Sequence, residues 1–217
     1  MPDLFTAARL AEEAADETIG PGAVLLRGFA LRFAAEVFPA LAEIAGRAPF
    51  RHMTTPWGAA MSVAMTNCGD AGWLSDRTGY RYDRIDPQSG EAWPAMPACF
   101  RALATQAASR AGYPGFVPDA CLINCYAPGT RLSLHQDRDE RDFTQPIVSV
   151  SLGLSAAFQF GGLRRHDPVR KYLVQDGDVV VWGGASRLAY HGVAELPPGE
   201  HAVLGAQRIN LTFRRAL

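Results

Sequence analysis

Residues 207–214 read Gln-Arg-Ile-Asn-Leu-Thr-Phe-Arg, a strict alternation of polar and apolar side chains. Successive side chains of a β-strand point to opposite faces, so this stretch predicts a strand with one apolar and one polar face. The apolar face must pack against a core, whereas the polar face is either solvated or lines the inside of a barrel. The barrel interpretation brings four polar side chains into the interior: Arg208, Asn210, Thr212 and Arg214.

The two arginines of this strand have the chemistry to hold a small diacid. Each guanidinium can bind a carboxylate through two parallel hydrogen bonds. Their backbones would lie roughly 20 Å apart in a strand, and two long side chains leaning toward each other would close most of that distance. Another apolar strand carries Asn124 and Tyr126. If buried, these polar groups need partners, and a bound carboxylate would supply them.

The last hundred residues contain about eight short strands separated by turn signals and no helical pattern. This arrangement predicts a sandwich or jelly roll of antiparallel strands. The fold class we expect is mainly β with flanking helices. The expected strands are residues 119–126, 131–136, 147–154, 157–160, 171–175, 178–182, 189–193 and 207–214.

The first half of the chain predicts two amphipathic helices, over residues 31–48 and 98–111. Pro39 is expected to bend the first helix or end it early. We also expect strands at 22–28 and 61–67 and a ribbon around 73–82.

Composition restricts the class of protein. The chain has 217 residues with 48% hydrophobic side chains and a net charge of −1, which fits one domain with its own core. A charge near zero argues against a general nucleic-acid coat but allows a local basic groove. The sequence predicts no membrane span, and its acidic N-terminal stretch is unlike a signal or transit peptide. Four cysteines without a CxxC motif indicate reduced thiols, so we expect a cytoplasmic protein.

The sequence His135-Gln-Asp137 indicates a metal site. In a strand, residues two apart share a face, so an imidazole and a carboxylate can converge on one point. With a distant histidine they form the two-histidine, one-carboxylate set that holds Fe(II) and leaves positions open. His191 is the preferred third ligand because it lies in a strand-like stretch of the same half. The other candidates are His52, His166 and His201.

Iron with open positions and a diacid clamp are the equipment of a 2-oxoglutarate-dependent oxygenase. The sequence also resembles the AlkB family of Fe(II)- and 2-oxoglutarate-dependent DNA-repair dioxygenases. The matching stretches extend from about residue 50 onward and include residues 61–68, 85–88, 93–97, 118–124, 132–137, 147–154, 158–163, 177–184 and 210–214.

The resemblance implies a double-stranded β-helix (jelly roll) core over residues 117–217 and an extension with a nucleotide-recognition lid over 1–116, in one compact unit. Fe(II) would be held by His135, Asp137 and His191. The cosubstrates would be 2-oxoglutarate and O2. Arg208 would bind the distal carboxylate of 2-oxoglutarate and Arg214 the carboxylate close to iron. The implied 2-oxoglutarate set is Asn124, Cys125, Tyr126, Arg208, Asn210 and Arg214.

By the same resemblance the lid lies within residues 51–82, and Trp73 would stack on an extruded base against His135. The expected substrates are 1-methyladenine and 3-methylcytosine in single- or double-stranded DNA, with RNA as a further substrate. Oxidative demethylation would release formaldehyde, succinate and CO2. The implied substrate contacts are Trp73, Tyr80, Arg81, Tyr82, Asp139 and Arg165.

Three lid residues depart from the family pattern: Trp57, Ala59 and Arg81. They bear on substrate range and strand preference rather than on reaction type. Two other functions stay open on the sequence alone. One is an oxygenase acting on a protein or small-molecule substrate, and the other is a cupin-like metal-binding module without turnover. With no coiled coil in the pattern, we expect a monomer that binds no membrane.

Overall fold

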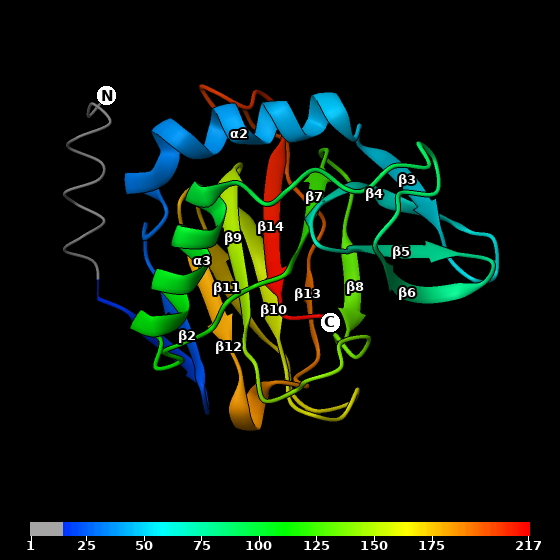
Figure 1. Ribbon diagram of the computed structural model, residues 1–217. Helices are drawn as coiled ribbons and strands as arrows, with labels where there is room; N and C mark the ends of the chain where they lie inside the picture. Colours follow the sequence, from blue (N-terminus) through cyan, green and yellow to red (C-terminus); the bar gives the residue numbers. More distant parts are fainter. Residues whose placement is uncertain (1–14) are drawn as a thin grey trace.

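The computed structural model describes residues 15–217. The prediction that the acidic N-terminal stretch is not a signal or transit peptide concerns residues 1–14 in part, and these lie outside the described range. Two antiparallel sheets pack face to face (Figure 1). The larger has the order β1-β2-β12-β9-β14-β7-β4-β3 and the smaller β11-β10-β13-β8. The large sheet comprises β1 (Glu17–Gly20), β2 (Ala23–Leu26), β3 (Arg51–Thr54), β4 (Ala60–Gly69), β7 (Ala120–Tyr126), β9 (Ile147–Gly153), β12 (Val179–Trp182) and β14 (Arg208–Arg214). The small sheet comprises β8 (Leu132–His135), β10 (Ala156–Phe160), β11 (Arg170–Val174) and β13 (His191–Val193).

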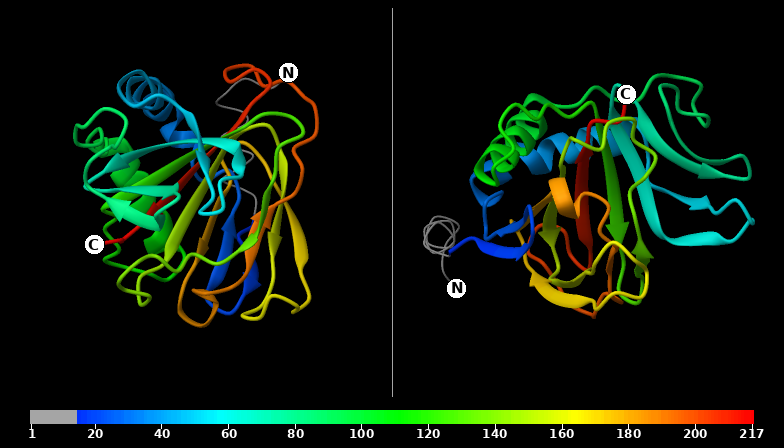
Figure 2. Two further views of the ribbon diagram at one scale, coloured as in Figure 1. Left: turned by 90° about the vertical axis from the view of Figure 1, so that its right-hand side faces the viewer. Right: turned by 90° about the horizontal axis from the view of Figure 1, so that it is seen from below.

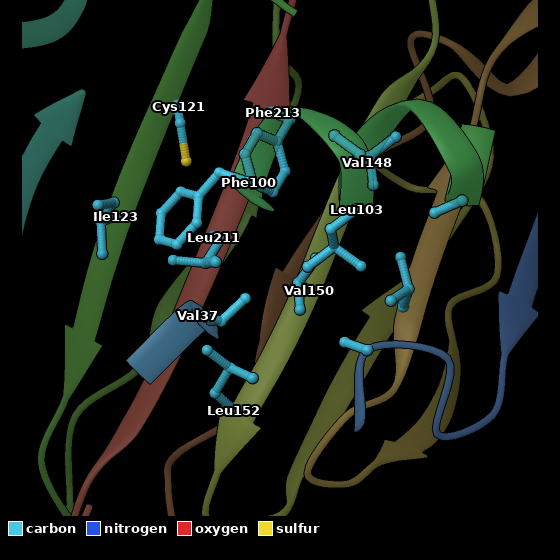
Figure 3. Close-up of a cluster of buried hydrophobic side chains, with 14 of the residues drawn as sticks. Val37, Phe100, Leu103, Cys121, Ile123, Val148, Val150, Leu152, Leu211 and Phe213 are labelled. Carbon is cyan, nitrogen blue, oxygen red and sulfur yellow. The ribbon is translucent and has the colours of Figure 1, made fainter. Parts of the chain in front are cut away.

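Two α-helices cover the outer face of the large sheet: α2 (Ala34–Arg47) and α3 (Ala98–Arg110). Short 3-10 turns precede α2 (η1, Leu31–Phe33) and follow β12 (η2, Gly184–Ser186). The helices bury their apolar stripes against the outward side chains of β7, β9 and β14 (Figure 3). Among the described residues, no helix has the length and apolar content needed to cross a membrane.

Helix α2 continues through Pro39 to Arg47, so the expected early end is wrong. Proline removes one N–H donor and leaves the carbonyl of Ala35 without its helical partner. Both Pro39 and Ala35 lie on the exposed side of the helix, where water can solvate that carbonyl. Val37, Leu41 and Ile44 on the opposite side stay buried and hold the helix to the sheet.

Strand β14 lies at the centre of the large sheet, paired with β7 and β9. Its apolar side chains Ile209, Leu211 and Phe213 join the core under the helices, as the alternation predicts. Its four polar side chains are also buried and line a cavity between the sheets. The polar face of β14 therefore lines an interior cavity, and the solvated-face alternative is wrong.

Two hairpins extend from one side of the molecule (Figures 1 and 2). One joins β3 to β4, and the other pairs β5 (Gly72–Asp76) with β6 (Gly79–Asp83), which is the ribbon expected around residues 73–82. The first half of the chain also contributes β2 beside β12 and β4 beside β7. Residues from both expected segments, 1–116 and 117–217, thus share one sheet. Strands β1 and β3 were not predicted, because each has a single large apolar residue, Ile19 and Met53.

Candidate metal and cosubstrate site

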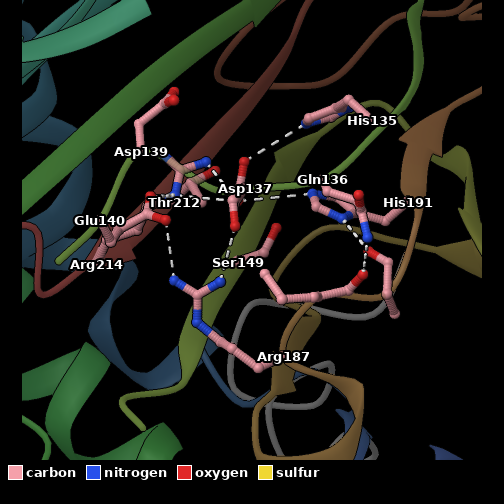
Figure 4. Close-up of polar contacts among 12 residues, drawn as sticks. His135, Gln136, Asp137, Asp139, Glu140, Ser149, Arg187, His191, Thr212 and Arg214 are labelled. Atoms are coloured by element: carbon pink, nitrogen blue, oxygen red, sulfur yellow. Dashed lines mark hydrogen bonds and ion pairs between the residues drawn. The ribbon is translucent and has the colours of Figure 1, made fainter. Parts of the chain in front are cut away.

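The structure brings His135, Asp137 and His191 together between the sheets (Figure 4). Their ligand atoms all lie within 4.8 Å of one another. Nε2 of His135 lies 3.7 Å from Oδ1 of Asp137, and Nε2 of His191 lies 3.7 Å from Oδ2. Two imidazoles and one carboxylate facing a common point form a donor set that fits Fe(II).

Strand pairing produces this convergence. His191 on β13 is paired directly with His135 on β8. Nδ1 of His135 lies 2.8 Å from the Ser133 carbonyl, and Nδ1 of His191 lies 3.0 Å from the Ala189 carbonyl. With Nδ1 bonded to the backbone, each ring turns Nε2 toward Asp137.

Strand β8 ends at His135, so Asp137 lies two residues beyond the strand rather than within it. Other contacts hold this segment in place. The Gln136 amide donates to the Leu188 carbonyl, and the Arg187 guanidinium donates to the Asp137 carbonyl at 3.0 Å. Asp139, two residues further on, also lies outside the strand.

The charge environment prepares these side chains to bind a cation. Burial would raise the pKa of Asp137, but the Arg214 guanidinium and the two imidazoles hold that pKa below its usual range. Burial, reinforced by His135, lowers the pKa of His191 to about 4. Near pH 7 the carboxylate is charged and the His191 ring is neutral, which are the protonation states that metal binding requires.

A buried network surrounds Asp137 on the side away from the histidines (Figure 4). Nη2 of Arg214 lies 2.7 Å from Asp137 Oδ2, and its Nε lies 3.3 Å from Glu140. Glu140 also pairs with Arg187 at 3.0 Å and accepts a hydrogen bond from the Tyr82 hydroxyl at 2.7 Å. Glu140 and Arg187 are positioning residues that the sequence did not reveal, because 47 positions separate them and no motif links them.

The opposite end of the cavity fits an anion. The Arg208 side chain is 1% exposed, and its one hydrogen bond is from Nη2 to the Ser151 hydroxyl at 2.9 Å. Within the described residues, Nε and Nη1 of Arg208 have no hydrogen-bond partner. The Tyr126 hydroxyl and the side-chain Oδ1 of Asn124 have none there either. A buried guanidinium without a counter-ion is costly, and a carboxylate bound there would supply the missing partner. The Arg208 N–H groups and the Tyr126 hydroxyl are donors that fit the distal carboxylate of 2-oxoglutarate.

The two arginines of β14 differ in what they have available. Each guanidinium nitrogen of Arg214 has a partner in Asp137, Glu140 or the Tyr82 hydroxyl, whereas Nε and Nη1 of Arg208 have none among residues 15–217 and can serve a clamp. Asn210 donates to Ser149 at 2.8 Å and lies between them. The Cys125 side chain packs on the opposite face of β7, in the core under the helices. It does not line the cavity, in contrast to what the resemblance implied.

The other three histidines lie apart from this group. Nδ1 of His52 lies 2.8 Å from the Met61 carbonyl in the exposed β3–β4 hairpin, and Nε2 of His201 lies 3.4 Å from Asp176. His166 is exposed in the loop between β10 and β11. Within residues 15–217, His191 alone completes the metal set.

The cavity has a volume of about 520 Å³ and also reaches the β5–β6 hairpin. Trp73 and Tyr80 line it as a stacked pair, with ring centroids 5.6 Å apart and planes at 14°. Trp73 Nε1 donates to Asp139 at 2.7 Å. The buried Asn67 amide holds the Trp73 backbone through two hydrogen bonds, a role no sequence pattern indicated.

The remaining expected substrate residues lie outside the cavity lining. Arg81 pairs with Asp76 at 2.9 Å, and Tyr82 turns its hydroxyl toward Glu140. Arg165 is exposed and donates to the Leu134 carbonyl at 3.3 Å.

Comparisons with known proteins agree with this site. The model of the 2OG-Fe(II) oxygenase superfamily matches residues 22–214. The alpha-ketoglutarate-dependent dioxygenase AlkB of Escherichia coli is 56% identical over 216 residues, 100% of this chain and 98% of that protein. An AlkB homolog of Caulobacter vibrioides is 47% identical over 79% of this chain and 77% of its own length. The structure of OsALKBH1 superposes with a TM-score of 0.80 at 28% identity, covering 93% of this chain and 100% of that one. The chain belongs to the 2OG-Fe(II) oxygenase superfamily.

Proposed function

We propose that this protein repairs alkylated DNA by oxidative demethylation of 1-methyladenine and 3-methylcytosine. As a member of its superfamily it is a dioxygenase that uses Fe(II), 2-oxoglutarate and O2. One observation carries the choice of substrate. A single cavity joins the metal triad to an aromatic pair on an outer hairpin, so a flat base can reach the metal.

His135, Asp137 and His191 hold the iron in this proposal. When bound, Fe(II) would let O2 oxidise 2-oxoglutarate to succinate and CO2 and, with its second oxygen atom, convert an N-methyl group to a hydroxymethyl group, which leaves as formaldehyde. Arg214 holds Asp137 in place and neutralises its charge, while the backbone contacts of both histidines fix their ring orientation. These contacts set the metal geometry before the substrates arrive.

Arg208 and Tyr126 bind 2-oxoglutarate at its distal carboxylate, because their donor groups are buried and unpartnered among the described residues. Asn124 lines the same cavity and contributes through its side-chain amide, which now donates to Asn210 at 3.3 Å. Asn210 and Arg214 lie toward the carboxylate next to iron. Cys125 contributes through its backbone at most, since its side chain faces the core.

The base enters between Trp73 and His135 and presents its methyl group to the metal. Asp139 accepts a hydrogen bond from the exocyclic amino group of the base, replacing its bond to Trp73. Tyr80 and Arg165 face the sugar-phosphate side. Arg81 contributes there through its backbone, because its guanidinium is paired with Asp76, and Tyr82 contributes through its ring, because its hydroxyl is bonded to Glu140. Alkylated bases favour this arrangement because a damaged base that has lost its pairing is cheaper to extrude from the stack.

We also infer that the two facing sheets are a double-stranded β-helix and that residues 51–82 act as a nucleotide-recognition lid. The protein works as a cytoplasmic monomer in this proposal. Its substrates include single-stranded and double-stranded DNA and extend to RNA.

An anaerobic titration with Fe(II) and 2-oxoglutarate, followed by air and a methylated oligonucleotide, tests the function. We expect succinate release stimulated by the oligonucleotide and a mass loss of one methyl group. Succinate without stimulation would point to a protein or small-molecule substrate. No succinate at all would favour a metal-binding module without turnover.

A further inference from the structure

One tryptophan is not used by the site described above. Trp93 and Trp182 are buried, and Trp73 lines the cavity. Trp57 is 84% exposed, more than any other large hydrophobic side chain in residues 15–217. It lies at the tip of the β3–β4 hairpin, one of the two hairpins that extend from the molecule (Figure 2).

The turn that carries Trp57 is held by its own hydrogen bonds. The Thr55 N–H donates to the Ala59 carbonyl at 2.8 Å, and the Gly58 N–H donates to the Thr55 carbonyl at 2.8 Å. The Thr55 hydroxyl accepts from the Ala59 N–H at 3.1 Å. Gly58 has a φ of +85°, which glycine adopts without strain. A fixed backbone therefore presents the indole to solvent.

This hairpin also forms one wall of the cavity. Thr55, Met61, Ser62 and Val63 line it, on both sides of the tip. Trp57 is two residues from Thr55, so their Cα atoms are separated by at most ~7 Å. The Ser62 hydroxyl donates to the Arg131 carbonyl at 3.1 Å, which ties the hairpin to the opposite rim.

We propose that Trp57 is a stacking platform for a nucleotide next to the extruded base. This inference rests on the proposed function. Along a DNA strand neighbouring nucleotides rise ~3.4 Å per step, so a base held in the cavity places its neighbours within reach of Trp57. Stacking on an aromatic ring tolerates every base because each base has a flat π-face.

The surroundings of Trp57 favour a nucleic acid over an apolar protein surface. The next exposed residues, Gly58, Ala59 and Ala60, offer little apolar area, and a protein-binding patch usually extends over a few hundred Å². Arg131 on the cavity rim is exposed and has no ion-pair partner within the part of the chain that the structure describes. An isolated flat ring on a hairpin whose Ser62 is bonded to the Arg131 backbone, with the Arg131 cation on the cavity rim, suits a single strand.

The test combines Trp57→Ala with oligonucleotides that lack one base. A short methylated single strand is prepared intact, with an abasic nucleotide on the 5′ side of the lesion, and with one on the 3′ side. Dissociation constants are measured with Mn(II) in place of iron and with 2-oxoglutarate present. We expect Trp57→Ala to weaken binding of the intact strand by about 5- to 100-fold, the range of a single lost stack. One abasic substitution should weaken wild-type binding by a similar factor and change Trp57→Ala binding less than about twofold.

Matched variants separate stacking from damage to the fold. Trp57→Phe keeps a ring and should retain most of the affinity. Leu173→Ala removes another exposed hydrophobic side chain, on β11 away from the cavity, and should change nothing. Unchanged strand binding by Trp57→Ala would overturn the inference, as would an equal loss of 2-oxoglutarate affinity or a change of oligomeric state. If the wild-type protein binds the methylated strand but releases no formaldehyde, the proposed function fails while the stacking result stands.

Discussion

The two ends of the cavity are built in opposite ways. The metal end surrounds Asp137, and the outer end, called the lid end after the lid proposed above, is formed by the β3–β4 and β5–β6 hairpins. At the metal end, Asp137, Glu140, Arg187 and Arg214 are buried and bonded to one another. At the lid end, Tyr80 and Trp57 are exposed. Arg81 pairs there with Asp76 and Asp83 of its own hairpin. The metal end has little freedom to move, whereas the lid end presents aromatic surface to a partner. Substitutions at the two ends should therefore affect different measurements.

The largest effect is expected from His191→Ala. Loss of one of three metal ligands should exceed the ~10–100-fold that loss of an outer-shell partner costs, and should abolish Fe(II) binding and demethylation together. Anaerobic Co(II) titration by absorption spectroscopy measures the affinity directly. His201→Ala is the matched control, because His201 pairs with Asp176 outside the cavity. Demethylation retained by His191→Ala would exclude this ligand.

Arg208→Ala should raise the 2-oxoglutarate concentration needed for half-maximal activity by roughly 30-fold or more, since truncating one partner of a buried charge pair costs ~2–5 kcal/mol. Arg208→Lys keeps the charge but loses the forked geometry and should fall in between. Oligonucleotide affinity should not change. An unaltered 2-oxoglutarate requirement would remove Arg208 from the cosubstrate site.

Trp73→Ala should weaken binding of a methylated oligonucleotide by ~1–3 kcal/mol and leave 2-oxoglutarate binding unaltered. Trp73→Phe retains a ring but loses the hydrogen bond to Asp139, so it separates stacking from the polar contact. Fluorescence anisotropy measures the first quantity and isothermal titration the second. Equal losses in both would mean that the indole only supports the fold.

The smallest effect is expected from Arg81→Ala. Its charge is already matched by Asp76 and Asp83, and exposed pairs contribute ~0–1 kcal/mol. The slope of log Kd against log salt should stay the same. Arg131→Ala, which removes a cation without an ion pair among the described residues, should reduce that slope by about one. A reduced slope for Arg81→Ala would show that its guanidinium contacts phosphate.

The sequence could predict features that depend on local patterns but not those that depend on contacts between distant residues. The faces of β14 and the histidine–carboxylate spacing are local patterns, and pairing between β8 and β13 then places His191 beside His135. The network of Glu140 and Arg187 depends on which distant charges meet in the interior, and no local pattern encodes that meeting. Asn67, which anchors Trp73, is only six residues away from it and was missed for another reason: its amide bonds to backbone atoms, which carry no sequence signal.

Strand β4 connects both aromatic platforms to the fold. Its Ala64–Gly69 part is paired with β7 inside the large sheet, and β3 pairs with its other edge between Ala60 and Met65, next to the hairpin tip. Strand β4 is therefore anchored in the large sheet at its Gly69 end and projects from it at its Ala60 end. Asn67 attaches Trp73 to the anchored end of β4, and Trp57 lies just beyond the projecting end. In the proposed function, the slot for the damaged base therefore keeps its shape, and the turn of Trp57, held by its own hydrogen bonds, offers the neighbouring base a surface at a set distance from that slot.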